Sequence, residues 1–127
     1  MVVGGGNSAA QLLAEISETT TTTWVTHIPP RFLPDDVDGR ALFDVATRRA
    51  AGRPDTGGIT ALGDIVMIPS VVAARERGVL QSVSMFEGLT VDGVYWFDRE
   101  QHAEVIVWAT GFRPGPGPPS APVSAPA

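Results

Sequence analysis

The apolar and polar positions of the first residues predict a strand, a helix and a second strand. Residues 1–3 are apolar and lead straight into three glycines, which is typical of a buried strand that meets a tight turn. From Asn7 to about Glu18 the apolar residues suit a helix packed on a sheet, and Asn7 or Ser8 is placed to cap its start. β-branched and aromatic residues then favour a second strand over residues 22–27.

Prolines and acids interrupt this pattern in the middle of the chain. Three prolines between residues 29 and 34 exclude regular structure, and three acids after them offer caps for a helix over residues 39–51: Asp35, Asp36 and Asp38. Residues 52–63 are predicted as a loop and residues 65–68 as a short extended piece. Pro69 can then open a short helix that Gly78 ends.

From residue 79 onward, short apolar runs separated by turns predict a small antiparallel meander. Its expected strands cover residues 80–86, 89–91, 94–97 and 105–108, with a hairpin turn at Asp92 and Gly93. Residues 113–127 are rich in Pro, Gly, Ser and Ala, and we expect a disordered tail. We therefore expect an α/β fold over residues 1–112: a Rossmann-like, three-layer NAD(P)-binding domain with a parallel sheet and a small meander, truncated in its first strand.

Composition narrows the function classes. A length of 127 residues with 43% hydrophobic and 18% charged residues is ordinary for one globular domain. No apolar run approaches the roughly 20 residues that cross a bilayer, and a net charge of -5 disfavours a nucleic-acid partner. The absence of cysteine excludes disulfides and thiolate chemistry, so redox chemistry needs a bound cofactor. No secretory signal pattern opens the chain, and we expect a cytoplasmic location.

The glycine-rich turn carries the strongest chemical signal. Residues 4–9 fit the dinucleotide pattern GxGxxG/A between a strand and a helix, and the candidate pyrophosphate ligands are Gly4, Gly5, Gly6, Asn7, Ser8 and Ala9. Gly4 would make the sharp turn, Gly6 would let the backbone approach the phosphates, and Ala9 would let the helix lie close to the strand. The free amides and the dipole of the helix start also favour an anion. The alternative is a flexible glycine loop.

The end of the second predicted strand bears on the choice of dinucleotide. No acid stands about 20 residues beyond the glycine pattern, where NAD-specific folds hold the ribose hydroxyl. Thr26, His27 and Arg31 instead place polar or cationic groups there, which suits the 2′-phosphate of NADP(H). Solvated loop residues are the alternative interpretation for His27 and Arg31.

Other candidate residues favour structural roles. His27 and His102 are far apart in the sequence and have no carboxylate at metal-ligand spacing, so no metal site is expected. Ser8 has no nucleophile elbow around it. The tryptophans fall on predicted strands and are expected in the core: Trp24, Trp96 and Trp108.

Four strings together resemble the NADPH-binding domain of flavin-dependent monooxygenase-like proteins: VVGGGNSAAQLLAEIS, TTTWVTHIPPRFLPDDVDGRALFD, GDIVMIPSVVAARERGV and EVIVWATGF. These belong to the FAD/NAD(P)-binding oxidoreductases of the pyridine nucleotide-disulfide reductase fold, with relatives linked to arsenic resistance and to potassium-transport flavoproteins. The resemblance covers Val2 to about Arg113. It implies that GGGNSA holds the NADPH pyrophosphate, and that the chain crosses back toward an FAD domain at a second motif, Ala109, Thr110 and Gly111.

The departures from that family shape the expected function. The family's earlier FAD-binding glycine pattern is missing before Met1, and His27 stands where relatives often have arginine. The resemblance therefore implies the NAD(P)H-binding portion of an FAD-dependent oxidoreductase, in which NADPH delivers a hydride to FAD. We expect this chain alone to be inactive, with no residue assigned as catalytic. Two alternatives stay open: a truncated nucleotide-binding module without turnover, and a subunit that gains FAD from a separate FAD-binding chain.

Overall fold

The computed structural model describes residues 1–37, 40, 44, 47–48, 50–52 and 64–111. The helix predicted over residues 39–51 and the loop predicted over residues 52–63 lie largely outside these ranges. The tail predicted over residues 113–127 lies wholly outside them.

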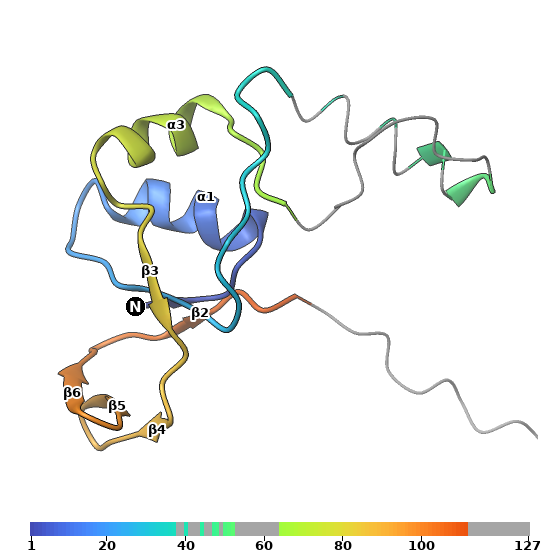
Figure 1. Cartoon of the computed structure of the whole chain (residues 1–127). Helices are drawn as coiled ribbons and strands as arrows, with labels where there is room; N and C mark the ends of the chain where they lie inside the picture. Colours follow the sequence, from blue (N-terminus) through green and yellow to red (C-terminus); the bar gives the residue numbers. More distant parts are fainter. Residues whose placement is uncertain (38–39, 41–43, 45–46, 49, 53–63, 112–127) are drawn as a thin grey trace, which may run out of the picture.

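A parallel sheet forms the centre of the fold (Figure 1). Its four strands run in the order β3 (Ser82–Ser84), β2 (Trp24–Thr26), β1 (Val2–Val3) and β7 (Val107–Trp108). Every neighbouring pair is parallel, and β1 pairs with β2 on one side and β7 on the other. The first strand in the sequence therefore lies inside the sheet, between its second and its last strand.

Two helices cover one face of this sheet. α1 (Asn7–Ile16) buries the small residues Ala9, Ala10 and Ala14 together with Leu13, so that it lies close to the strands. α3 (Pro69–Glu76) packs against α1, with Pro69 at its start and Gly78 just beyond its end at a positive φ of 77°. No helix of the described ranges has the length and apolar character that a membrane span requires.

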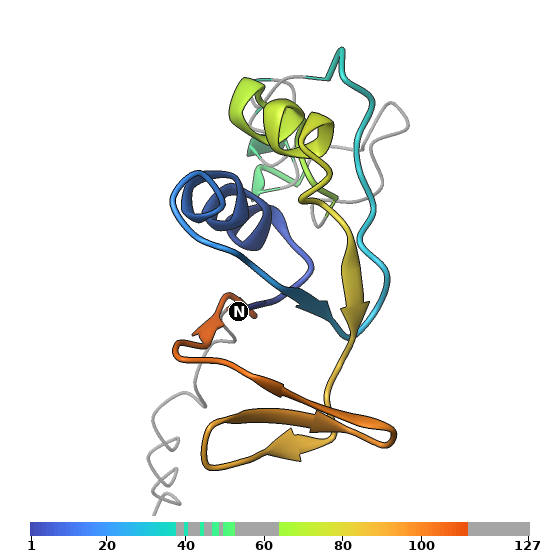
Figure 2. The ribbon, with the colours of Figure 1, turned by 90° about the vertical axis from the view of Figure 1, so that its left-hand side faces the viewer.

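The opposite face is covered by a small antiparallel sheet (Figure 2). β4 (Gly88–Leu89), β5 (Gly93–Trp96) and β6 (Arg99–His102) form two successive hairpins, with β5 in the middle. The turn predicted at Asp92 and Gly93 joins β4 to β5, and the Thr90 amide donates to the Gly93 carbonyl at 2.8 Å. The layers are thus helices, parallel sheet and antiparallel sheet.

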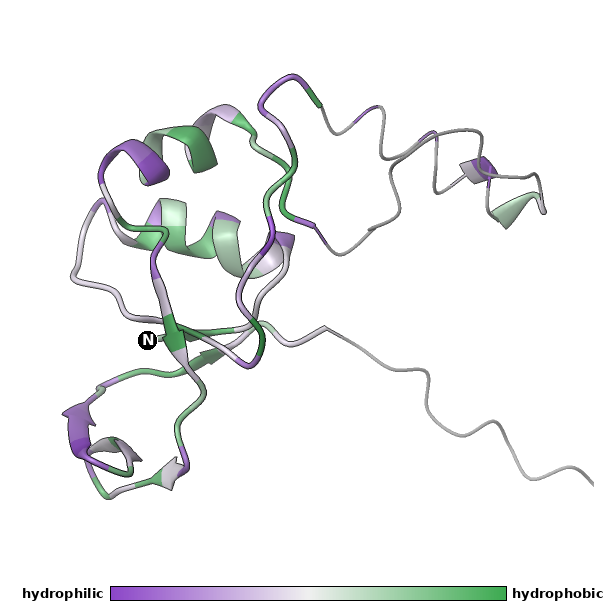
Figure 3. Cartoon of the chain, in the orientation of Figure 1, coloured by the Kyte–Doolittle hydropathy of each residue, from purple (hydrophilic) through white to green (hydrophobic). Residues whose placement is uncertain are grey.

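Alternation along the short parallel strands explains how one sheet serves two cores. Val2 and Trp24 join the cluster beneath the helices, whereas their successors Val3 and Val25 join Phe86 and other residues on the side of the antiparallel sheet. Hydrophobic residues gather along α1 and the parallel strands, and β6 is hydrophilic (Figure 3). The predicted three-layer α/β fold is confirmed.

Three sequence predictions about this region are wrong in detail, and one strand was not predicted. Residues 80–86 and 105–108 were assigned to the meander, but the strands they contain, β3 and β7, pair in parallel with β2 and β1. The polar strand β6 has no apolar alternation and was not predicted. Trp108, expected in the core, is 54% exposed, because it lies on an edge strand of the parallel sheet and borders the larger cavity, where its ring meets Phe86 edge to face.

Candidate functional site

The glycine turn lies at the carboxyl end of β1, beside the ends of β2 and β7. Because all three strands are parallel, the loops that leave them meet at one edge of the sheet. The chain passes from β1 through α1 to β2 on one side, whereas β7 lies on the other side, so this edge is the topological switch point at which α/β sheets bind ligands. The two sequence motifs, at residues 4–9 and 109–111, meet here.

Gly4 joins the two motifs. Its φ of 141° suits glycine, and a Cβ added to it would collide with the backbone carbonyl of Ala109. Its amide donates to the Val25 carbonyl at 2.9 Å, and its carbonyl accepts a bond of 2.6 Å from the buried Trp24 indole. The Ala109 amide in turn donates to the Val3 carbonyl at 2.7 Å. The backbones of the turn and of the second motif are therefore in close contact.

The start of α1 opens onto a hollow of about 320 Å³. Gly6 is the N-cap, in extended conformation, and no side chain caps the helix. A Cβ added to Gly6 would meet no atom within 4 Å, so the backbone here is uncovered. The hollow is lined by residues of both motifs: Gly5, Gly6, Asn7, Ser8, Ala109, Thr110 and Gly111. The first amides of a helix lack partners within the helix, and here they adjoin open space.

Asn7 does not cap the helix as the sequence suggested. Its Nδ2 donates to the Asp64 carbonyl at 3.1 Å, and its Oδ1 accepts a bond of 2.8 Å from the Val66 amide. The side-chain amide of Asn7 thus donates one hydrogen bond to the backbone of this extended segment and accepts one from it, as a neighbouring strand would. Both bonds are directed away from the amides at the helix start. Asn7 therefore ties the glycine turn to residues 64–66 and leaves the helix start open.

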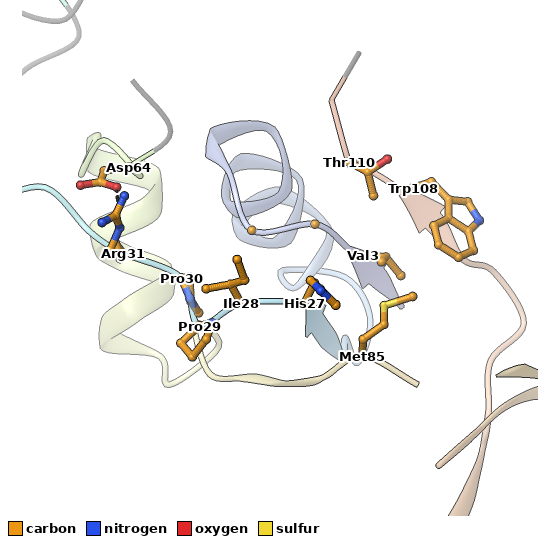
Figure 4. A pocket seen from close by; sticks show the side chains of 12 residues that line it. Val3, His27, Ile28, Pro29, Pro30, Arg31, Asp64, Met85, Trp108 and Thr110 are labelled. Atoms are coloured by element: carbon orange, nitrogen blue, oxygen red, sulfur yellow. Dashed lines mark ion pairs between the residues drawn. The ribbon is translucent and has the colours of Figure 1, made fainter. Parts of the chain in front are cut away.

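A larger cavity of about 470 Å³ also adjoins the glycine turn (Figure 4). Its lining combines the glycine turn with the loop after β2 and with residues far away in the sequence: Val3, Gly4, Gly5, His27, Ile28, Pro29, Pro30, Arg31, Asp64, Met85, Trp108 and Thr110. Gly5 and Thr110 also line the smaller hollow. The two spaces therefore adjoin each other along the carboxyl edge of the sheet.

Arg31 and Asp64 form an ion pair at the border of this cavity. Arg31 Nε lies 3.0 Å from Asp64 Oδ1, and the side chains are 73% and 17% exposed, respectively. The backbones on either side are paired as well, because the Ile65 amide donates to the Arg31 carbonyl and the Leu33 amide donates to the Ile65 carbonyl, both at 2.8 Å. Asp64 was not predicted as a site residue, since no spacing pattern links it to the glycine turn.

The predicted residues occupy different places around these spaces. Ala9 is buried under the helix, where its small side chain allows close packing on the sheet. Thr26 is 3% exposed, and its hydroxyl donates to the Ser82 hydroxyl at 3.0 Å, so it joins two strands rather than facing the cavity. His27 is exposed and lines the cavity, as does Arg31.

Comparison with known proteins gives structural relatives only. No model of a known protein family and no curated protein matches the chain. Among solved structures, it is similar to a flavin-containing monooxygenase from Stenotrophomonas maltophilia, with 43% identity over 89% of this chain and a TM-score of 0.70. A doubly substituted variant of a flavin monooxygenase from the same organism matches at 44% identity over 90%, also with a TM-score of 0.70.

The chain spans about three-tenths of the length of these relatives: 29% of the first and 30% of the second. Identity at this level over most of the chain supports common origin with part of a flavoprotein oxidoreductase. The sequence similarity and the three-layer fold both support this common origin. The chain therefore corresponds to a flavin monooxygenase-like segment.

Proposed function

We propose that this chain is the NAD(P)H-binding portion of an FAD-dependent, monooxygenase-like oxidoreductase. The observation that carries the proposal is the start of α1, which has no side-chain cap and opens onto a hollow between the two motifs. Glycine at position 6 leaves the backbone uncovered, and a helix start of this kind suits a pyrophosphate. The similarity to flavin monooxygenases supports the same assignment.

The two neighbouring spaces fit the parts of a dinucleotide. The pyrophosphate would lie on the backbone of residues 5–8, where the helix dipole favours negative charge. The adenosine ribose, with its 2′-phosphate in NADPH, would lie toward His27 and Arg31 in the larger cavity. Thr110 and Gly111 close the hollow from the side of β7. Thr26 supports this end of β2 through its bond to Ser82.

Bound NADPH would supply a hydride, which FAD accepts in the proposed parent enzyme. The residues of this chain would bind and orient the dinucleotide, and none of them is assigned a proton-transfer role. We propose that FAD binds to another part of the parent enzyme, since this chain corresponds to 29% of the length of the first relative. The link to arsenic resistance and potassium-transport flavoproteins stays a prediction.

Calorimetric titration with NADPH and with NADH tests the site. Gly6→Val puts a branched side chain over the phosphate position, and the open space around Gly6 lets the variant fold. Gln11→Val, on the exposed side of α1, is the matched control for adding a branched residue to the same helix. We expect binding in the wild type and the control and a loss of at least about tenfold in affinity for Gly6→Val. Equal heats from all three proteins would contradict the assignment.

A nucleotide-binding module without turnover of its own is the second candidate. Such a module would act only with a flavin held by a separate FAD-binding chain. It predicts a colourless purified protein that binds NADPH and does not oxidise it when free FAD is added. A yellow flavin that copurifies with the 127-residue chain would show that this chain holds FAD itself.

A further inference from the structure

The ion pair between Arg31 and Asp64 has a consequence for the choice of dinucleotide. We infer that Asp64 competes with the 2′-phosphate of NADPH for Arg31 and thereby lowers the preference of the site for NADPH over NADH. This inference rests on the proposed function, since it concerns the adenosine end of the same site. It assigns a specificity-determining role to Asp64 and a positioning role to Asn7.

The position of the pair supports this role. Arg31 and Asp64 line the same cavity, with Nε and Oδ1 3.0 Å apart (Figure 4). Arg31 is largely exposed and can meet a ligand, whereas Asp64 is mostly buried and keeps its place. The only other side chain of the cavity that can carry charge is His27, among the residues that line it. An anion that reaches Arg31 therefore meets the Asp64 carboxylate at the same point.

The backbone around Asp64 is fixed to the glycine turn. Asn7 accepts from the Val66 amide at 2.8 Å and donates to the Asp64 carbonyl at 3.1 Å. The Ile65 amide donates to the Arg31 carbonyl at 2.8 Å, so the two ion-pair partners also belong to paired backbone segments. Moving the backbone of Asp64 away from Arg31 would break several of these bonds. The Asp64 carboxylate would consequently stay within the length of one side chain of a 2′-phosphate bound at Arg31.

Charge decides how the two dinucleotides differ. The 2′-phosphate is largely dianionic at neutral pH, and Asp64 both repels it and occupies the guanidinium that would bind it. NADH lacks this phosphate and has a ribose hydroxyl instead, which can donate a hydrogen bond to a carboxylate. Removing the carboxylate charge should therefore strengthen NADPH binding by about fivefold, the size expected for unit charges a few ångströms apart in solvent. NADH should bind no more tightly.

The experiment is calorimetric titration of the full chain with NADPH, NADH and adenosine 2′,5′-bisphosphate, which carries only the adenosine end of NADPH. Asp64→Asn removes the charge and keeps the shape of the side chain. Glu18→Gln removes one negative charge beyond the far end of α1 and is the matched control. We expect Asp64→Asn to tighten NADPH and the bisphosphate about fivefold and Glu18→Gln to change neither beyond about 1.5-fold.

Arg31→Gln and the double variant separate competition from simple repulsion. If Asp64 acts by holding Arg31, the gain from Asp64→Asn should largely disappear when Arg31 is already Gln. An unchanged ratio of NADPH to NADH affinity in Asp64→Asn would overturn the inference while the proposed function stands. An equal gain with and without Arg31 would overturn the competition. Failure of all three probes to bind the wild type would overturn the proposed function and the inference together.

Discussion

Replacement of Gly4 by Ala tests the junction on which the site depends. The added Cβ would collide with the carbonyl of Ala109. In addition, residues other than glycine rarely adopt the φ of 141° found at this position. Both effects act at the contact between β1 and β7, where the Ala109 amide donates to the Val3 carbonyl. The substitution therefore adds backbone strain at residue 4 and also pushes the two strands apart.

The magnitude follows from these contacts. Holding a residue other than glycine at such a φ costs about 1–3 kcal/mol. Moving β7 away to relieve the collision weakens a strand hydrogen bond that contributes about 1 kcal/mol. We expect Gly4→Ala to lower the free energy of unfolding by about 2–4 kcal/mol, a large part of the roughly 5–15 kcal/mol of a typical domain.

Urea denaturation followed by tryptophan fluorescence measures this change. Gly6→Ala is the control in the same turn, because its added Cβ meets no atom within 4 Å and its φ of -108° suits any residue. The control should shift stability by no more than about 1 kcal/mol. If Gly4→Ala were as stable as Gly6→Ala, the close contact between the two motifs would not exist in the folded protein.

Three further substitutions give smaller, local tests. Trp24→Phe removes the indole donor of the buried Gly4 carbonyl and should cost about 1–3 kcal/mol in urea denaturation. Asn7→Ala removes two hydrogen bonds to the neighbouring extended segment, so the amide that donates to Asn7 should exchange its hydrogen faster. Hydrogen bonds from Arg75 lower the pKa of Asp35. The wild type should therefore have a higher free energy of unfolding than Asp35→Asn at pH 7, and this difference should shrink as the pH falls below about 4. A gap independent of pH would contradict that pairing.

Local sequence patterns predicted where the helices and strands lie better than they predicted which strands pair with each other. Strand, turn and helix at the start of the chain follow from apolar runs and glycines, and the structure confirms β1, α1 and β2. Short apolar runs near residues 82 and 107 look the same whether they pair in parallel or antiparallel. Only the tertiary structure assigns them to the edges of the parallel sheet.

In the candidate site, too, local features could be predicted from the sequence, whereas contacts between residues distant in the sequence could not. The glycine pattern identified the turn, because its spacing reflects a local backbone requirement. Asp64 has no such pattern, since it reaches Arg31 through the pairing of two extended segments that lie on either side of a long stretch of sequence. The side chain of Asn7 looked like a helix cap for a related reason: its true partners, at residues 64 and 66, are distant in sequence.

The geometry explains why a dinucleotide site would require both ends of this segment. The hollow at the start of α1 has one wall from the glycine turn and one from residues 109–111. That second wall exists only because β7 returns to pair beside β1, and Gly4 permits this approach by lacking a side chain. Residues 64–66 add a third constraint through Asn7. The strand β1 has two residues, and it would position a ligand because two segments distant in the sequence, residues 64–66 and 109–111, fix the turn that follows it.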